Sequence, residues 1–181
     1  MLAPSVYEVR STDWTLAATG FVVAAVPYAL SDRIIRERCP CDPRQVNSWD
    51  RGAVGNASRG AEIASDLTLG GAMLAPPLWD YAILGNSEAF REDALVYAQT
   101  LSASAALVSL VKHAVQRPLP RTYAGDVKLI SSPGGYRSFY SGHATMTVSA
   151  LSVASLTSNL RYGFSPWPWI VTALAGVSVS V

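Results

Sequence analysis

Residues 94–111 read ALVYAQTLSASAALVSLV, a run of 18 residues without one charged side chain. A helix crosses the apolar core of a bilayer in about 20 residues, with about 17 as the lower end. The run is therefore long enough for a membrane-spanning helix, and it ends at Lys112. Its many Ala and Ser residues also suit a buried helix of a soluble bundle, because small side chains let helices approach closely.

Three further stretches share this character: residues 14–31, 138–160 and 162–181 carry no Asp, Glu, Lys or Arg. A weaker fifth segment, 61–84, holds three acidic residues and is interrupted by two adjacent prolines. The chain is 15% charged, against ~25% in an ordinary soluble domain. Without strand-like alternation, the pattern predicts an all-α fold, a single domain over residues 1–181 with about five transmembrane helices. The expected helices cover about 14–31, 61–84, 92–115, 142–160 and 164–181.

Two long polar loops, 32–60 and 116–140, separate the expected helices. Together with Lys112 they hold all but three of the 14 basic residues; the exceptions are Arg10, Arg91 and Arg161. With five spans both loops emerge on one face, and the positive-inside rule places that face in the cytoplasm. The net charge of +1 gives no overall field that would attract nucleic acid.

Cys39 and Cys41 form the sequence CPC in the first loop. Residues two apart are poorly placed for an unstrained disulfide, and a metal pair would need further ligands, with no histidine nearby. We expect these cysteines to serve loop structure without further chemistry. A bond between the two, or to another chain, is the alternative.

Two sequence blocks flank the loop 116–140. VKHAVQRPLPRTY (111–123) ends one expected helix, and SFYSGHAT (138–145) opens the next. The start of a helix presents unsatisfied N–H groups and a partial positive charge, which suit an anion. Ser141 and Gly142 would let the backbone approach such an anion closely.

Cationic side chains and a histidine complete this pattern. Lys112 with Arg117 or Arg121 would form a cationic cup around the same anion. His143, directly after the glycine, would give a proton to an oxygen that leaves a phosphoryl group. The residues therefore point to phosphate chemistry, with 116–140 as the active-site loop.

The two blocks resemble those of the type 2 phosphatidic acid phosphatase (PAP2) superfamily, which also includes class A acid phosphatases and vanadium haloperoxidases. The superfamily pattern is K-x6-R-P, then P-S-G-H, then S-R-x5-H-x3-D. The matching positions here are Lys112, Pro120, Ser141, Gly142 and His143, with Tyr140 in place of the usual proline. The resemblance spans roughly residues 92–160 and extends to the order of the helices.

The sequence departs from that pattern twice. In strict register the first-block arginine falls on Leu119, so Arg117 or Arg121 must supply its phosphate contact, or the contact is missing. Between His143 and Val181 there is neither a further histidine nor an S-R pair. The resemblance implies that the third block holds the histidine nucleophile and an aspartate that orients it. We therefore expect a PAP2-like bundle incomplete at its C-terminus, a fragment or a natural truncation, with almost no turnover.

The resemblance implies hydrolysis of a lipid-borne phosphomonoester or pyrophosphate through a phospho-histidine and without a metal cofactor. His143 would be the acid, while Lys112, Arg117 or Arg121, Ser141 and Gly142 would hold the phosphoryl oxygens. The partners would be the lipid bilayer and a phosphorylated lipid or small phosphoester, not nucleic acid. Bacterial membrane members usually carry the site on the periplasmic side, so we favour an inner-membrane protein with a periplasmic site, against the count of basic residues.

Two other functions stay open. The chain could be a non-catalytic membrane protein that binds phosphate or lipid headgroups, or a haloperoxidase with vanadate in the same pocket. Several residues also have purely structural interpretations. The Lys112 side chain could extend from a helix end to the membrane interface, and His113 would lie at that interface without a catalytic task. His143 could be a packing residue, and Arg137 could be solvated or touch a lipid headgroup. The roles of Asp50, Arg51 and Asp66 could be limited to helix capping and ion pairing.

Overall fold

The computed structural model describes residues 6, 8–36, 39, 41–48, 50–56 and 58–179. This part of the chain is helical and contains no strand. The helices are α1 (Ser11–Ala29), α2 (Ser31–Ile34), α3 (Arg59–Leu84), α4 (Glu88–Val115), α5 (Pro120–Tyr123), α6 (Val127–Ile130), α7 (Gly142–Tyr162) and α8 (Trp167–Ser178), with short 3-10 turns η1 (Pro43–Gln45), η2 (Arg51–Ala53) and η3 (Pro133–Tyr136). The predicted all-α fold is confirmed, and the five long helices begin and end within a few residues of the predicted bounds.

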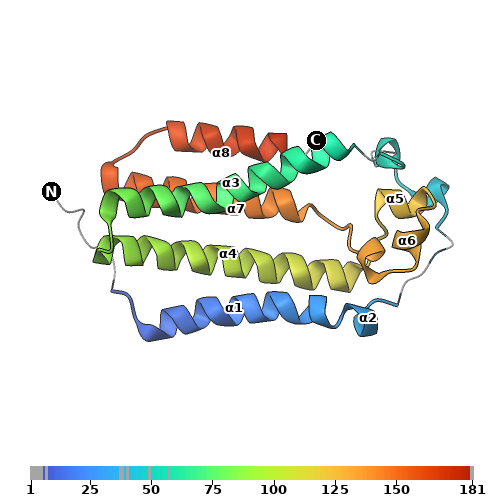
Figure 1. Cartoon of the computed structure of the whole chain (residues 1–181), viewed down its shortest axis with the longest axis horizontal. Coiled ribbons are helices and arrows are strands. Elements are labelled where there is room, and N and C mark those ends of the chain that lie inside the picture. The colour runs from blue at the N-terminus through green and yellow to red at the C-terminus, as the bar shows by residue number, and fades with distance from the viewer. Residues whose placement is uncertain are drawn as a thin grey trace.

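Helix α4 lies at the centre of the bundle. It packs against α1, α3 and α7, while α7 also packs against α3 and α8. Figure 1 shows the long helices side by side, with α5 and α6 at one end and the α3–α4 and α7–α8 connections at the other. Helices α4 and α7 run in opposite directions, so the end of α4 and the start of α7 meet at the end that carries α5 and α6.

Small residues bring α1 and α4 into close contact. A Cβ atom at Gly20 would lie 2.6 Å from the hydroxyl oxygen and 2.8 Å from the Cβ of Ser102, so a larger residue would push the helices apart. The Ser109 hydroxyl donates a hydrogen bond to the Ala24 carbonyl at 2.7 Å. The Ala- and Ser-rich sequence of α4 is thus explained by backbone approach across this interface.

Helix α3 continues through Pro76 and Pro77, although the sequence predicted an interruption there. Two prolines leave the carbonyls of Ala72 and Met73 without their usual donors four residues later. The Tyr97 hydroxyl, from α4, lies 2.9 Å from the Ala72 oxygen and 3.2 Å from the Met73 oxygen. One phenol therefore serves the two backbone acceptors that the prolines leave open.

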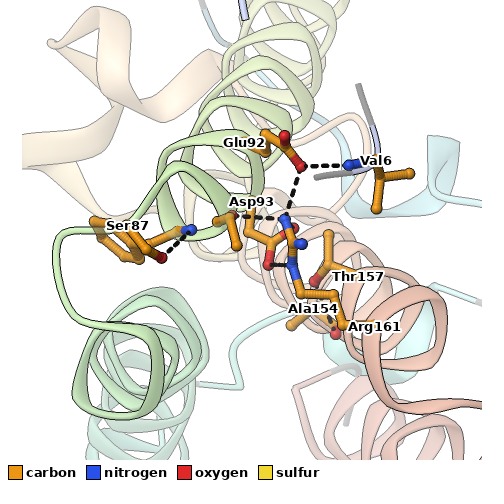
Figure 2. A network of polar contacts seen from close by, with 9 residues as sticks. Val6, Ser87, Glu92, Asp93, Ala154, Thr157 and Arg161 are labelled. Carbon is orange, nitrogen blue, oxygen red and sulfur yellow. Dashed lines mark hydrogen bonds and ion pairs between the residues drawn. The ribbon is translucent and has the colours of Figure 1, made fainter. Parts of the chain in front are cut away.

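The far end of the α4–α7 pair is joined by a buried ion cluster. Figure 2 shows the Arg161 guanidinium, from the end of α7, between Glu92 and Asp93 of α4. It binds both carboxylate oxygens of Asp93, lies 3.0 Å from Glu92 Oε2, and donates to the Ala89 carbonyl at 2.6 Å. The Arg161 side chain is 1% exposed and that of Glu92 is 2% exposed. Such a cluster fixes which turns of the two helices meet, because a buried charge without its partner is costly.

One helical stretch of the described residues, Glu88–Tyr123, is long and apolar enough to cross a membrane by length and composition. The other expected spans do not meet this test of length and apolarity; α8 is apolar but has 12 residues, fewer than a bilayer crossing needs. Charged residues in α3 and the many Ser and Thr residues of α7 lower their hydropathy. One of the five predicted spans therefore has the length and composition of a membrane helix, and crossing by all five stays a prediction.

The Tyr97→Phe variant tests the role of the phenol beside the two prolines. Loss of the hydroxyl leaves the Ala72 and Met73 carbonyls unsatisfied, and we expect the free energy of unfolding to fall by about 1–3 kcal/mol. Denaturant unfolding in neutral detergent measures it. Tyr81→Phe, which removes a hydroxyl from an exposed ring on α3, is the matched control. Equal losses in both variants would remove the special role of Tyr97.

Candidate active site

Helix α7 starts at the second sequence block. The Ser141 hydroxyl accepts a hydrogen bond from the Ala144 N–H at 3.2 Å, so it caps the helix and Gly142 is the first helical residue. The remaining N–H groups of the first turn have no partner within the helix. The hydroxyl of Tyr140, the residue in place of the usual proline, is buried and without a hydrogen bond among the described residues.

The Lys112 ammonium lies directly beside this helix start. Lys112 comes from the last turn of α4 and donates a hydrogen bond to the Arg137 carbonyl at 3.0 Å. A Cβ atom at Gly142 would lie 3.8 Å from Lys112 Nζ. Lys112 and Gly142, 30 residues apart in the chain, thus meet at one point, where a bound anion would contact an ammonium and a helix N-terminus together.

A groove of about 400 Å³ opens at this point. Its polar lining comes from the end of α4 and the first turn of α7: Lys112, Gly142 and His143. Its apolar and aromatic lining comes from α1, α3, α4 and α7: Phe21, Ala24, Ala25, Tyr28, Leu69, Ala105, Val108 and Met146. The groove therefore joins a cationic mouth to an apolar wall.

His143 is held by a carboxylate that the sequence analysis assigned only to capping and pairing. Its Nε2 atom lies 2.8 Å from Asp66 Oδ1, across from α7 to α3. Both side chains are partly exposed, 45% for His143 and 63% for Asp66. The signal in the sequence was a carboxylate two turns into an otherwise apolar helix, where a charge is costly unless it has a function or a partner.

The two arginines expected in the cationic cup are both paired with aspartates. Arg117 lies 2.6 Å from Asp50 and lines a separate cleft of about 130 Å³. Hydrogen bonds from the Arg117 guanidinium, and secondarily from Asn47, hold the pKa of Asp50 below its usual value, so this pair is ionised at neutral pH. Arg121 lies 3.2 Å from Asp126 and lines neither this cleft nor the groove.

Arg137 is the arginine that the structure places at the groove. Its guanidinium carbon lies 4.9 Å from the ring centre of Tyr28, a groove residue, and its carbonyl accepts the Lys112 hydrogen bond. No ion pair of Arg137 is found within the described part of the chain. Sequence reasoning considered Arg137 for a headgroup contact but looked to Arg117 and Arg121 for the cup, because they lie next to Leu119 in the chain.

Hydrogen bonds to the Gly135 carbonyl hold the active-site loop together. The Gly135 carbonyl accepts hydrogen bonds from the Leu119 N–H at 2.8 Å and the Thr122 hydroxyl at 3.0 Å. A Cβ at Gly135 would lie 2.2 Å from the Leu129 oxygen, so a side chain cannot fit without moving the backbone. Proline at the first helical position of α5 explains why the loop forms a helical turn where the sequence predicted none.

The first loop is attached to the active-site loop through Tyr136. This phenol is fully buried, accepts a hydrogen bond from the Cys39 N–H at 2.8 Å and donates to the Ile130 carbonyl at 3.1 Å. Cys39 and Cys41 form a disulfide with each other. The expectation of cysteines without further chemistry is therefore wrong; the alternative of a bond between the two is the one observed.

His113 is buried rather than interfacial, which corrects its predicted position. Its Nδ1 atom lies 2.8 Å from the Ser109 carbonyl oxygen and its Nε2 atom 3.0 Å from the Ser31 hydroxyl. A carbonyl only accepts, so Nδ1 carries the proton. This histidine links α4 to the α1–α2 corner.

The family model described as the PAP2 superfamily matches residues 93–181, which include Lys112, Ser141, Gly142 and His143. Residues 93–181 belong to the PAP2 superfamily. No curated protein and no solved structure matches the chain. PAP2 phosphatases act on phosphoric esters, in general without a metal. Among the described residues no group of three or more His, Cys, Asp or Glu side chains is arranged to hold a metal ion.

The Gly142→Ala variant tests the contact between ammonium and helix start. The added methyl would make ordinary contacts of 3.6–3.9 Å with Val108 and Lys112, so the fold should survive. It would occupy the position of a PAP2-bound oxyanion, and we expect tungstate affinity to fall about tenfold or more, measured by calorimetry. Gly71→Ala, in open space on α3, is the control and should bind normally. Unchanged binding by Gly142→Ala would place the anion elsewhere.

Proposed function

We propose that the chain carries the phosphate-binding part of a PAP2-type phosphatase for a lipid-borne phosphomonoester or pyrophosphate. The observation that carries this proposal is the position of the Lys112 ammonium beside Gly142 at the start of α7. A phosphoryl group between them would accept hydrogen bonds from the first turn of α7 and neutralise the ammonium.

Each side chain then has a distinct role. Lys112, the Gly142 backbone and the Ser141 capping turn hold the phosphoryl oxygens, and Arg137 supplies the guanidinium that Leu119 lacks. Arg117 and Arg121 keep the loop in place through their aspartates. This division follows from charge pairing within the active-site loop: of its three arginines, Arg137 is the one without a carboxylate partner among the described residues, and a phosphate dianion would be its counterion.

In the reaction, the bond from phosphorus to the leaving oxygen breaks, its electron pair goes to that oxygen, and His143 delivers the proton that the oxygen takes up. The resemblance assigns the attack on phosphorus to a third-block histidine, and residues 144–181 contain none. We therefore propose that this chain binds the phosphoester and releases almost no phosphate.

The groove supports a substrate with an apolar chain. Its walls below the cationic mouth are Ala, Val, Leu, Met and Phe side chains, so a lipid tail could lie there while its phosphate remains at Lys112. Large apolar side chains are also exposed outside the groove, including Leu16 on α1, Leu67 on α3 and Leu174 on α8, each at least 65% exposed. Large apolar side chains exposed in this way favour contact with lipid.

The charges of the α4–α7 pair also suit a bilayer. Neither helix carries a charge between the site at one end and the Arg161 cluster at the other. From Gly142 to Arg161, α7 rises roughly 30 Å at 1.5 Å per residue, the thickness of a hydrocarbon core. We propose an integral protein of the bacterial inner membrane.

The site would face the periplasm. The Cys39–Cys41 disulfide lies in the loop attached to Tyr136 of the active-site loop, and disulfides persist in oxidising compartments. This argument outweighs the basic-residue count, because Arg117 and Arg121 serve the loop and Arg137 the substrate.

Loss of either groove cation should abolish or weaken anion binding. We expect tungstate to bind the purified chain in neutral detergent, Lys112→Ala to lose detectable binding, and Arg137→Ala to weaken it at least tenfold. Arg44→Ala, which removes a 91% exposed side chain of the first loop, is the control with unchanged affinity. A phosphate-release assay on phosphatidic acid should show almost no turnover; robust turnover abolished by His143→Ala would refute our account of this chain, and normal binding by Lys112→Ala would refute the site.

The orientation has its own test. Intact cells treated with a membrane-impermeant reductant and then an impermeant maleimide should be labelled at Cys39 and Cys41, which are the two cysteines of the chain. The Cys39→Ser, Cys41→Ser double variant is the control for background. Labelling that requires permeabilised cells would place the loops and the site in the cytoplasm.

A further inference from the structure

We infer that Asp66 is the positioning residue of His143: it takes the Nε2 proton in a hydrogen bond and so makes Nδ1 the ring nitrogen that serves the leaving oxygen. This inference rests on the proposed function and adds to it a residue outside the matched blocks. Asp66 lies 77 residues before His143 in the chain, on α3, and its Oδ1 atom is 2.8 Å from His143 Nε2.

The chemistry of the pair fixes the proton. An ionised carboxylate has no hydrogen to donate, so the hydrogen bond requires the proton on Nε2. Neutral imidazole has one N–H, and the partner of one nitrogen decides the state of the other. Nδ1 has no hydrogen bond to another described residue and is the nitrogen left for a bound oxyanion.

Among the charged side chains near His143, Asp66 is the carboxylate that binds the ring. Lys112 of α4 lines the same groove as His143, and Arg137 from the loop lies beside Tyr28. Helix α1 contributes apolar and aromatic side chains to that groove. Glu62 lies one turn before Asp66 on α3, near its N-terminal end, and is exposed.

The proton balance of the step is simple. In a PAP2 site that holds the third-block histidine, that histidine would form the new bond to phosphorus while the bond to the leaving oxygen breaks, and Nδ1–H of the doubly protonated His143 ring would pass its proton to that oxygen. The ring is then neutral. Its remaining proton stays on Nε2, hydrogen-bonded to Asp66, which remains a carboxylate throughout. Asp66 therefore sets the direction of transfer without receiving the proton.

The chain provides an internal reference for the test, because its two histidines should be opposite tautomers. His113 carries its proton on Nδ1, which donates to the Ser109 carbonyl, whereas His143 should carry it on Nε2. Imidazole-¹⁵N spectra of the full chain in neutral detergent, at a pH where both rings are neutral, should show one tautomer of each kind. Two rings of the same kind would overturn the inference.

The decisive variant is Asp66→Ala. We expect the His143 nitrogens to become an exchange average of the two tautomers, while the His113 signals stay unchanged and report an intact fold. Asp66→Asn, whose amide oxygen also accepts, should restore the Nε2 tautomer. If Asp66→Ala disturbs His113 as well, Asp66→Asn decides alone: a His143 that keeps its Nε2 proton supports the inference, and one that loses it opposes it.

Adding tungstate separates this inference from the proposed function. In the wild-type chain at neutral pH we expect bound tungstate to shift the Nδ1 resonance of His143 and to leave Nε2 unaffected. Binding that shifts Nε2 instead would overturn the role of Asp66 while the phosphate site stands. No tungstate binding at all would overturn the phosphate site, although the tautomers would still report the Asp66 contact.

Discussion

The site depends on one electrostatic constraint: a lysine ammonium, the positive end of a helix and a guanidinium lie together at the mouth of an apolar groove. Lys112 is stabilised from behind, because it lies in the last turn of α4, where the helix dipole is negative, and because it donates to the Arg137 carbonyl. On the groove side of Lys112, the N-terminal end of α7 at Gly142 and the Arg137 guanidinium add positive charge. A bound oxyanion would reduce this repulsion. The arrangement of positive groups therefore favours an anionic ligand, whatever hydrogen bonds that ligand makes.

The two ends of the α4–α7 pair differ in how their positive charges are neutralised. At the far end, Arg161 is enclosed with Glu92 and Asp93, and the protein supplies its own counterions. At the near end, the groove lining contains Lys112 and no acidic residue, and Asp66 reaches it only through His143. The Arg161 cluster holds α4 and α7 together at one end. At the other end we propose that a bound anion supplies the missing negative charge, so the same helix pair would form both the support and the binding site.

The sequence predicted the parts of this molecule that depend on local pattern. Uncharged runs located the long helices, and the spacing of Lys112, Ser141, Gly142 and His143 located the candidate site. It did not predict contacts between distant segments: Asp66 with His143, Tyr97 with the carbonyls before the prolines, or Arg137 in place of Leu119. Those depend on which helix turns face one another, and a carboxylate inside an apolar helix signals that a partner exists without saying which residue it is.

The Arg161 cluster also has a consequence for biosynthesis. Glu92 and Asp93 leave the ribosome 68 residues or more before the arginine that neutralises them. Until then the carboxylates of Glu92 and Asp93 lack the guanidinium that binds them in the finished bundle, which opposes their burial in a low-dielectric environment. We therefore expect the docking of α7 to stabilise the start of α4 as well as α7 itself.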